Sequence, residues 1–362
     1  MSQRPRLLML TVDYAPQTGG VPHLLSSIVD STADLIDWRV VTAAPGDETT
    51  GVIRTAGVRG LPAAAWRQRG WLRDAPNSMI ISAHVYLGPL AHIIGAITKV
   101  RVSSLTYGRE LTADRPHQRL SLLTLKRDHR TVTISRNSER LLHDLGVSPS
   151  QSGWVGTELT PGFPAVDRPS GVTRPSGLNL VAVTRLAEGY KNLEVTLRAV
   201  RVLADSGLVA SYTVVGDGPR RPALEQRIEQ LDLGDIVFLP GRVSDNDLAD
   251  LLVASHVGLF PSRDSLAEGG FEGFGIVVQE LAAAGLPVVV GDAAGARDAW
   301  RPEWSTVVDP DDVRQWVGAI AAYAEDEARR HREALAAHDF GTTLNSVNTS
   351  RRYVEELLGE PV

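Results

Sequence analysis

Two carboxylates, Glu272 and Glu280, lie eight positions apart in the segment EGFGIVVQE. The residues that follow have helical composition up to Gly285 and Pro287, so a helix is predicted to begin near Gly275. Backbone N–H groups in a first helical turn lack intrahelical partners and attract anions such as a diphosphate. One carboxylate could then reach an uncharged part of a ligand and the other a hydroxyl pair, which suggests a nucleotide-sugar site.

Two further features could hold phosphate. Arg185 and Lys191 flank a loop between a predicted strand and a helix, and two cations there suit a leaving diphosphate. The alternative is a surface salt-bridge pair. Gly19 and Gly20 follow another strand, where a backbone without side chains can approach a phosphate or sugar. The alternative for the glycines is a tight turn.

Polar residues at strand ends give further candidates. His84 ends an apolar strand, and ligands of open α/β sheets lie outside the carboxyl ends of strands. A hydrogen-bonded structural histidine remains the alternative.

The glycine turn 216–218 carries Arg221 where a dinucleotide fingerprint has its third glycine, which disfavours a nicotinamide dehydrogenase. Because no His and acidic residues cluster at ligand spacing, we expect no metal and no cofactor.

The elements that position these residues are short apolar strands alternating with helical patterns, which predicts an α/β fold with parallel sheets. A Pro-, Gly- and Ser-rich stretch at 161–177 separates two sets of strands. We expect two facing, doubly wound, Rossmann-like domains with a cleft between them. The boundaries are 1–165 for the acceptor domain, 166–177 for a linker, 178–342 for the donor domain and 343–362 for a helix packing back on the first domain. The expected strands are Leu7–Val12, Trp38–Thr42, Met79–Ser82, Val102–Thr106 and Val132–Ile134, then Leu180–Val183, Tyr212–Val215, Ile236–Leu239, Val257–Phe260 and Pro287–Val290.

The composition of the chain excludes several classes of protein and of functional site. The 362 residues are 43% hydrophobic and 22% charged, which is typical of globular proteins. A net charge of −6 does not indicate binding to nucleic acid, which ordinarily requires a basic surface. The chain has no cysteine, which excludes disulfides and a cysteine nucleophile. The N-terminal apolar run is too short for a signal peptide and no run suits a membrane span, so we expect a cytoplasmic protein.

Two basic segments, 66–73 and 119–130, mix cations with apolar residues. A membrane-surface helix has this composition. Amphipathic helices that cover a sheet have it too, with long basic stems at their edges. We favour the second interpretation and expect no membrane contact.

Taken together, these residues resemble the retaining nucleotide-sugar glycosyltransferases of the GT-B fold, in family 4. EGFGIVVQELAAAGLPVVV is similar to the E-x7-E motif of that family. PQTGGVPHLL, VTRLAEGYKNLEVTLRA and YTVVGDGPRRPALE resemble its glycine-rich loop, its Arg…Lys motif and its glycine turn, in the family's order.

The resemblance implies roles for individual residues. The catalytic set that it implies is His84, Arg185, Lys191 and Glu272, with the histidine near the transferred sugar and the two cations at the diphosphate. The donor set that it implies is Gly19 and Gly20 along the diphosphate and sugar, Gly216 in the glycine turn, Arg242 and Val243 near the base, the amides of Gly273, Phe274 and Gly275 beside the sugar, the amides of Ile276 and Val277 at the phosphate, and Glu280 at the ribose.

The chain departs from the family on the acceptor side. Tyr107 stands before Gly108 where the family often has histidine, ahead of Arg109. Asp13, Tyr107 and Arg109 are therefore acceptor candidates whose partner the sequence does not identify. An insert before the motif also offers Glu268 as an alternative partner for Glu280.

The resemblance implies transfer of a sugar from an NDP-sugar to a hydroxyl acceptor with anomeric retention, the donor phosphate taking the acceptor's proton. A glycosidase that uses Glu272 and Glu280 as acid and nucleophile is one alternative. A sugar-nucleotide epimerase and a non-catalytic nucleotide-sugar-binding protein are the others. The base, the sugar, the acceptor and the oligomeric state stay open.

Overall fold

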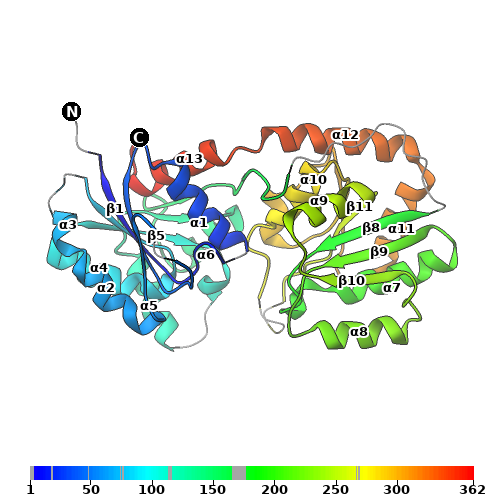
Figure 1. The fold of residues 1–362 in the computed structure, drawn as a ribbon, viewed down its shortest axis with the longest axis horizontal. Helices are drawn as coiled ribbons and strands as arrows, with labels where there is room; N and C mark the ends of the chain where they lie inside the picture. Colours follow the sequence, from blue (N-terminus) through cyan, green and yellow to red (C-terminus); the bar gives the residue numbers. More distant parts are fainter. Residues whose placement is uncertain are drawn as a thin grey trace. The chain divides into compact units, whose positions relative to one another are not determined.

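The computed structural model describes residues 4–17, 19–47, 49–73, 75, 77–112, 116–164, 177–265, 267 and 270–362, without the side chains of 116 and 117. Two compact units divide the chain: unit 1 is Met1–Leu159 with Asn345–Val362, and unit 2 is Thr160–Leu344 (Figure 1). Of the expected linker 166–177, only Gly177 is among the described residues, and Glu268 lies outside them.

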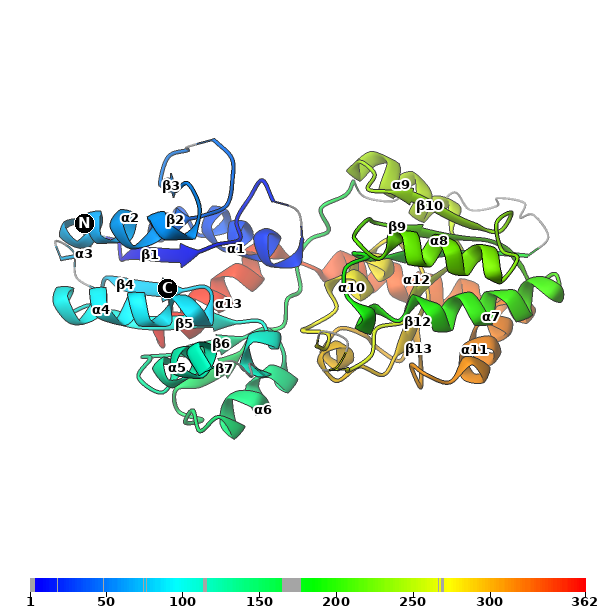
Figure 2. The same cartoon turned by 90° about the horizontal axis from the view of Figure 1, so that it is seen from below.

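Unit 1 is built on a seven-stranded parallel sheet in the order β3-β2-β1-β4-β5-β6-β7, which Figure 2 shows strand by strand. The order reverses its direction between β1 and β4, and such a switch point is where open α/β sheets bind ligands. The strands are β1 (Arg6–Thr11), β2 (Asp37–Thr42), β3 (Val52–Arg54), β4 (Met79–Ser82), β5 (Arg101–Thr106), β6 (Thr131–Thr133) and β7 (Ser152–Trp154).

Helices cover both faces of this sheet (Figure 1). The apolar side chains of α2 and α4 pack with those of β1 and β4 in one core cluster, and α1 packs beside α13 on the other face. The helices are α1 (Gly20–Ser31), α2 (Leu61–Arg67), α3 (Arg69–Arg73), α4 (Gly88–Thr98), α5 (Pro116–Leu125), α6 (Arg136–Asp144) and α13 (Ser346–Leu358), with 3-10 turns η1 (Val58–Gly60), η2 (Val85–Leu87) and η3 (Arg109–Thr112).

Unit 2 has the same type of architecture, built on a six-stranded parallel sheet in the order β10-β9-β8-β11-β12-β13. Here the switch point lies between β8 and β11. The strands are β8 (Leu178–Val183), β9 (Val209–Val215), β10 (Val237–Gly241), β11 (Val257–Phe260), β12 (Val288–Gly291) and β13 (Ser305–Val308). The helices are α7 (Leu193–Asp205), α8 (Arg221–Gln230), α9 (Asp245–Ala254), α10 (Ile276–Ala283), α11 (Val313–Glu325) and α12 (Glu327–Thr343), with 3-10 turns η4 (Gly189–Lys191) and η6 (Ala294–Asp298).

The predicted α/β architecture with two parallel sheets is confirmed, and each of the ten expected strands is present within a few residues. Three short strands, β3, β7 and β13, were not predicted. None of the helices in the described part of the chain is long and apolar enough to cross a membrane.

The C-terminal helix α13 docks on unit 1 through buried polar contacts as well as apolar packing. The Tyr353 hydroxyl donates to the carbonyl oxygen of Val155 at 2.7 Å and lies 3.2 Å from the Thr157 hydroxyl. The Ser103 hydroxyl donates to the carbonyl oxygen of Leu357 at 2.9 Å. Because these groups are buried, they are satisfied only while the helix stays docked.

We expect Tyr353→Phe to lower the free energy of unfolding by about 1–2 kcal/mol, because the buried Val155 carbonyl loses its donor. Urea denaturation measures the change. The control is Tyr86→Phe, the same substitution at a side chain that is 45% exposed, which leaves stability unchanged. Equal stabilities of the Tyr353 variant and the wild type would contradict this docking role.

Candidate active site

The sheet order of unit 2 brings two loops together at its switch point. The loop after β8 carries Arg185 and leads to Lys191, and the loop after the neighbouring strand β11 carries Ser262 and leads to Glu272. Residues that are about eighty positions apart in sequence therefore meet at one edge of the sheet.

Lys191 and Glu272 form an ion pair, with Nζ 2.6 Å from Oε2 and both side chains largely buried. The Ser262 hydroxyl donates to the same carboxylate oxygen at 3.3 Å. Burial alone favours the neutral form of each group, but their mutual attraction outweighs it, so the pKa of Glu272 is lowered and that of Lys191 is raised. Both groups are therefore charged at neutral pH.

The backbone around Glu272 is held by glycines that permit close approach. A Cβ on Gly295, in η6, would overlap the carbonyl oxygen of Glu272. At the facing loops, a Cβ on Gly216 would overlap the carbonyl oxygen of Thr184, and Gly216 has a φ of 131°. These positions require glycine because backbone meets backbone there.

Helix α10 begins where the sequence predicted. Gly275 precedes it in a left-handed conformation, with φ 83° and ψ 48°, and this N-cap residue has no side chain to cap the helix. The first turn also contains no acidic residue, so the N–H groups of Ile276 and Val277 keep their affinity for an anion. Phe274, which precedes Gly275, is buried.

Glu280, in α10, lies in an environment opposite to that of Glu272. Burial, and secondly the nearby carboxylate of Asp245, raise the pKa of Glu280 to about 7. Within the part of the chain that the structure describes, no hydrogen-bond donor or cation pairs with this carboxylate. A ligand that supplies hydroxyl donors would satisfy it.

The turn after β10 leads into α9, whose first residue Asp245 helps to raise the pKa of Glu280. Arg242, which is exposed, and Val243, which is half-buried, form this turn. The Gly216 amide donates to the Gly241 carbonyl at 2.8 Å, which joins the ends of β9 and β10.

Arg185 is 64% exposed and its guanidinium lies 3.5 Å from the carboxylate of Glu188. It shares with Lys191 a cavity of about 450 Å³ that also extends along α7 and α8. Arg185 is therefore an exposed cation near the ion pair rather than a member of it.

In unit 1, His84 and Asp13 lie at the switch point between β1 and β4. His84 Nε2 is 3.0 Å from the Asp13 carboxylate, which accepts, so Nε2 carries a proton. The Thr11 hydroxyl lies 3.3 Å from His84 Nδ1 and 2.8 Å from the Asp13 carbonyl oxygen, and its single proton can be donated to one of these two acceptors. Partners at both ring nitrogens fix the orientation of the imidazole.

Tyr107 stacks edge-on to His84, with ring centroids 5.6 Å apart. Its hydroxyl is buried and has no hydrogen-bond partner among the described residues, and burial raises its pKa. Its amide donates to the Glu110 carboxylate at 2.6 Å, and burial raises the pKa of Glu110. Arg109 is exposed.

Gly19 and Gly20 begin α1 as expected. Gly19 has a φ of 137°, and no side chain caps this helix either. The structure thus brings His84, Asp13 and Tyr107 together in one cluster, and Lys191 and Glu272 in another, each at the switch point of its sheet.

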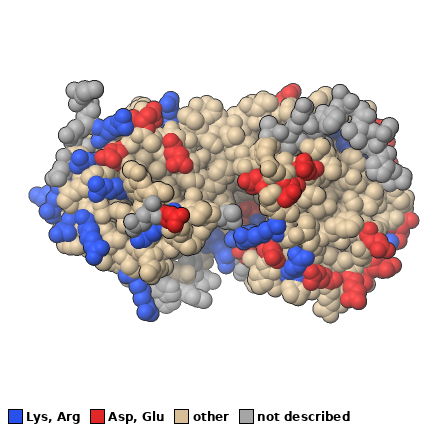
Figure 3. Space-filling model, in the orientation of Figure 1, with Lys and Arg blue, Asp and Glu red and all other residues tan. Residues whose placement is uncertain are grey.

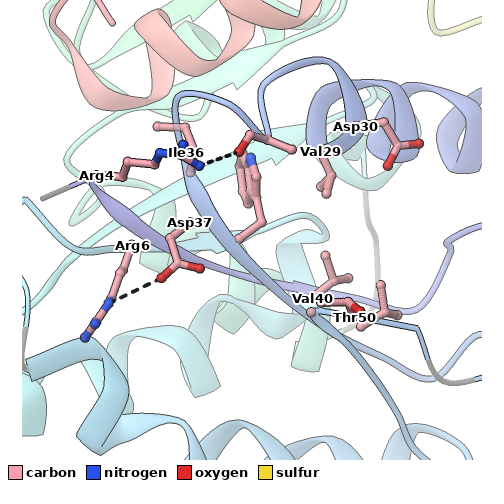
Figure 4. Close-up of a pocket in the computed structure, with 12 residues that line it drawn as sticks. Arg4, Arg6, Val29, Asp30, Ile36, Asp37, Val40 and Thr50 are labelled. Atoms are coloured by element: carbon pink, nitrogen blue, oxygen red, sulfur yellow. Dashed lines mark hydrogen bonds and ion pairs between the residues drawn. The ribbon is translucent and has the colours of Figure 1, made fainter.

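The cavity drawn in Figure 4, of about 470 Å³, is separate from both clusters. It is lined by Arg6 and Asp37, which open β1 and β2, so it lies at the amino ends of these strands, whereas His84 lies at the opposite edge. In the described ranges, no three His, Cys, Asp or Glu residues are grouped as metal ligands would be.

Residues 170–338 match the family model of Glycosyl transferases group 1. The chain contains a group 1 glycosyltransferase domain. Its matched range includes Arg185, Lys191, Glu272 and Glu280, and ends well before α13.

Two curated relatives are glycosyltransferases by name. The chain is 32% identical to the Escherichia coli K12 protein "Putative colanic acid biosynthesis glycosyltransferase WcaL" over 45% of its own length and 41% of WcaL, so it spans less than half of that relative. It is 25% identical to a Mycobacterium tuberculosis "GDP-mannose-dependent alpha-(1-6)-phosphatidylinositol monomannoside mannosyltransferase" over 93% of this chain and 94% of the relative.

Among solved structures, Anabaena HepE, crystallised with UDP and glucose, superposes with a TM-score of 0.77 at 18% identity, covering 97% of this chain and 99% of HepE. That likeness concerns the fold, which is GT-B in both. The expected fold class is confirmed.

Sequence reasoning missed several members of the two clusters, among them Ser262 as a partner of Glu272 and Asp245 as a neighbour of Glu280. Thr11 and Glu110 were also missed as partners of His84 and Tyr107. Ser262 and Thr11 carry a usable signal, because each lies at or just after the end of a switch-point strand. The sequence gives no such signal for Asp245, because acidic residues are common in the first turn of any helix.

The raised pKa of Glu280 predicts a stability change in Glu280→Gln. The carboxyl ionises near 4.5 ordinarily and near 7 in the fold, so the folded state loses stability as the pH rises through this interval. The Gln variant should exceed the wild type by up to about 3 kcal/mol near pH 8, and by nothing below about pH 4.5.

Urea denaturation at several pH values measures this difference. Glu229→Gln, an exposed position on α8, is the matched control and should show no such trend. If Glu280→Gln proved less stable than the wild type near pH 8, the burial of an unpaired carboxylate would be contradicted.

Proposed function

We propose that this chain is a retaining glycosyltransferase that moves a sugar from an NDP-sugar to a hydroxyl acceptor. The observation that carries the proposal is the surroundings of α10 in the group 1 domain. Its uncapped start follows Glu272, which is ionised and paired with Lys191, and precedes Glu280, whose carboxylate lacks a partner among the described residues.

The donor would bind to this helix start and the groups near it. The diphosphate suits the N–H groups of Ile276 and Val277 together with Lys191 and Arg185. Lys191 stays charged because Glu272 stabilises it, so it can neutralise the charge that grows on the departing diphosphate. These cations supply what a divalent metal would otherwise supply, and we propose a metal-independent reaction.

The two glutamates would contact opposite ends of the donor. Glu272 has one oxygen, Oε2, committed to Lys191 and Ser262, and its other oxygen can accept from a sugar hydroxyl. Glu280 would accept from the two ribose hydroxyls, and these donors would favour its ionised form. Arg242 and Val243, in the turn after β10, would then lie near the base.

Unit 1 would bind the acceptor through the cluster of His84, Asp13 and Tyr107. In the reaction, the bond from the anomeric carbon to the phosphate oxygen breaks and a bond to the acceptor oxygen forms on the same face. The acceptor proton passes to the departing phosphate oxygen. The protein's part is to position both substrates and to stabilise the leaving group.

One observation favours a second candidate, a glycosidase. Its acid and nucleophile need pKa values pushed apart, and Glu272 and Glu280 show this contrast. The low pKa of Glu272, however, comes from its ion pair with Lys191. This ion pair would make the carboxylate a weaker nucleophile. The uncapped helix start would also have no anion to bind.

We expect Glu272→Gln to lower kcat/KM for transfer about 10²–10⁴-fold, because the variant loses both a sugar contact and the partner that keeps Lys191 positioned. The donor is first chosen as the NDP-sugar that raises the melting temperature most. Glu303→Gln is the matched control and should keep full activity, because Glu303 is exposed and precedes β13, at the amino edge of the same sheet. Glu268→Gln tests the alternative glutamate: if it abolishes transfer while Glu272→Gln does not, the assignment of Glu272 is wrong.

The stereochemistry of the product distinguishes the candidate functions. We expect NMR of the early product to show the anomeric configuration of the donor. Donor alone should give no epimer, and an aryl glycoside without nucleotide should release no sugar. Inversion would refute the retaining mechanism, epimer formation would indicate an epimerase, and sugar release from the glycoside would indicate the glycosidase.

A further inference from the structure

The solvent side of α4 in unit 1 is apolar throughout. Ile93 is 59% and Ile97 44% exposed, and Ala96 between them is exposed as well. The helix contains no Lys, Arg, Asp or Glu, and the imidazole of His92 bonds to the buried carboxylate of Asp128 at 2.8 Å. A surface helix ordinarily turns a polar face to water, so this face is unusual.

The apolar surface continues onto α5. Leu120 is 64% and Leu123 56% exposed. The two helices are in contact, since a Cβ on Gly88 at the start of α4 would overlap the Thr124 hydroxyl of α5. On neighbouring helices α2 and α3, Trp66 is partly exposed under the Arg69 guanidinium, 4.7 Å from its centroid.

Cations surround these apolar side chains. Arg73 on α3 donates to the carbonyl oxygen of Ile97 at 3.0 Å, which fixes it beside the end of α4. Figure 3 shows Lys and Arg along the left edge of unit 1, where Figure 1 places α3 and α4. The exposed cations of these helices and their ends are Arg67, Arg73, Lys99, Arg119, Lys126 and Arg127.

This charge is concentrated locally. Residues 58–130 contain twelve Lys or Arg and four Asp or Glu, a net charge of +8, whereas the whole chain carries −6. The remaining residues therefore carry −14. Arg101 and Arg130 within this range pair with Glu360 and Glu356 outside it. The apolar helices thus lie in a region that stays basic, in an acidic chain.

We propose that the face formed by α2, α3, α4 and α5 docks reversibly on the surface of an anionic lipid bilayer. Exposed isoleucine, leucine and tryptophan side chains would enter the interface, and the surrounding cations would contact lipid phosphates. A second copy of this face would bring like charges together, which disfavours a symmetric dimer through it. The helices of segments 66–73 and 119–130 bury apolar side chains such as Leu72 and Leu122, as we expected of helices that cover a sheet. The proposal revises only the expectation of no membrane contact, because that packing does not account for the exposed apolar side chains of α4 and α5.

The same face reaches the cluster around His84. Tyr86, in η2 just before α4, is 45% exposed, and its ring lies 5.4 Å from that of His84. Docking would therefore hold the acceptor cluster of unit 1 close to the bilayer surface.

The test is flotation of the full chain with vesicles of phosphatidylcholine, with and without about one quarter phosphatidylglycerol. We expect binding only to the anionic vesicles, lost at high salt. The double variant Arg119→Gln with Arg127→Gln should bind about fivefold more weakly for each cation removed, and Ile93→Ser with Leu123→Ser at least about tenfold more weakly. The matched controls are Arg332→Gln and Leu335→Ser, exposed positions on α12, which should bind as the wild type does.

Other outcomes would overturn the proposal. These are absence of binding to anionic vesicles, equal binding to neutral vesicles, or equal binding by the wild type and both double variants. If size-exclusion chromatography shows a dimer that Ile93→Ser with Leu123→Ser dissociates, the face is instead an interface between copies. Circular dichroism and thermal melting establish that each variant is folded.

Discussion

The buried ion pair between Lys191 and Glu272 is the interaction on which the candidate donor site depends. It connects the loops after β8 and β11 across the switch point of the sheet. Neither charge can be removed alone, because the remaining one would be buried without a partner. The pair also determines the chemistry that each group can offer, since it keeps the lysine positive and the carboxylate an acceptor. Each loop is also packed against a further neighbour through a glycine, the loop after β8 against Gly216 and the loop after β11 against Gly295, where a Cβ would overlap a carbonyl oxygen.

Glu280, inside α10, has an environment opposite to that of Glu272, which lies in the loop before this helix. The Glu280 carboxylate lacks a partner among the described residues, and its ionisation is made unfavourable by burial. A group of this kind lowers the stability of the fold and is relieved by a ligand with hydroxyl donors. The two glutamates of the motif thus differ in physical state: the protein satisfies Glu272 itself and leaves Glu280 to the ligand.

Much of this could be predicted from the sequence. The ten expected strands are runs of apolar and β-branched residues, which burial on both sheet faces requires. The missed strands β3, β7 and β13 are each three or four residues long and end their sheets, so they carry little of that pattern. Helix α10 was predictable because Gly275 marks its start locally, helical composition follows, and Gly285 and Pro287 mark its end. The ion pair of Lys191 with Glu272 was not predictable from residue spacing. It forms because β8 lies between β9 and β11 in the sheet, which places the loops after β8 and β11 side by side.

The distribution of charge in unit 1 shows what composition conceals. A net charge of −6 indicates no affinity for an anionic surface, yet it is the sum of +8 over residues 58–130 and −14 over the rest. Charges act over about a Debye length, near 8–10 Å at physiological salt, so a surface responds to the cations that face it and not to the total. Likewise, the apolar composition of α4 is visible in the sequence, but it fits a buried helix equally well. Only the exposure of Ile93 and Ile97 in the structure shows that this helix turns apolar side chains outward. The cations on neighbouring helices then indicate that these side chains face an anionic surface.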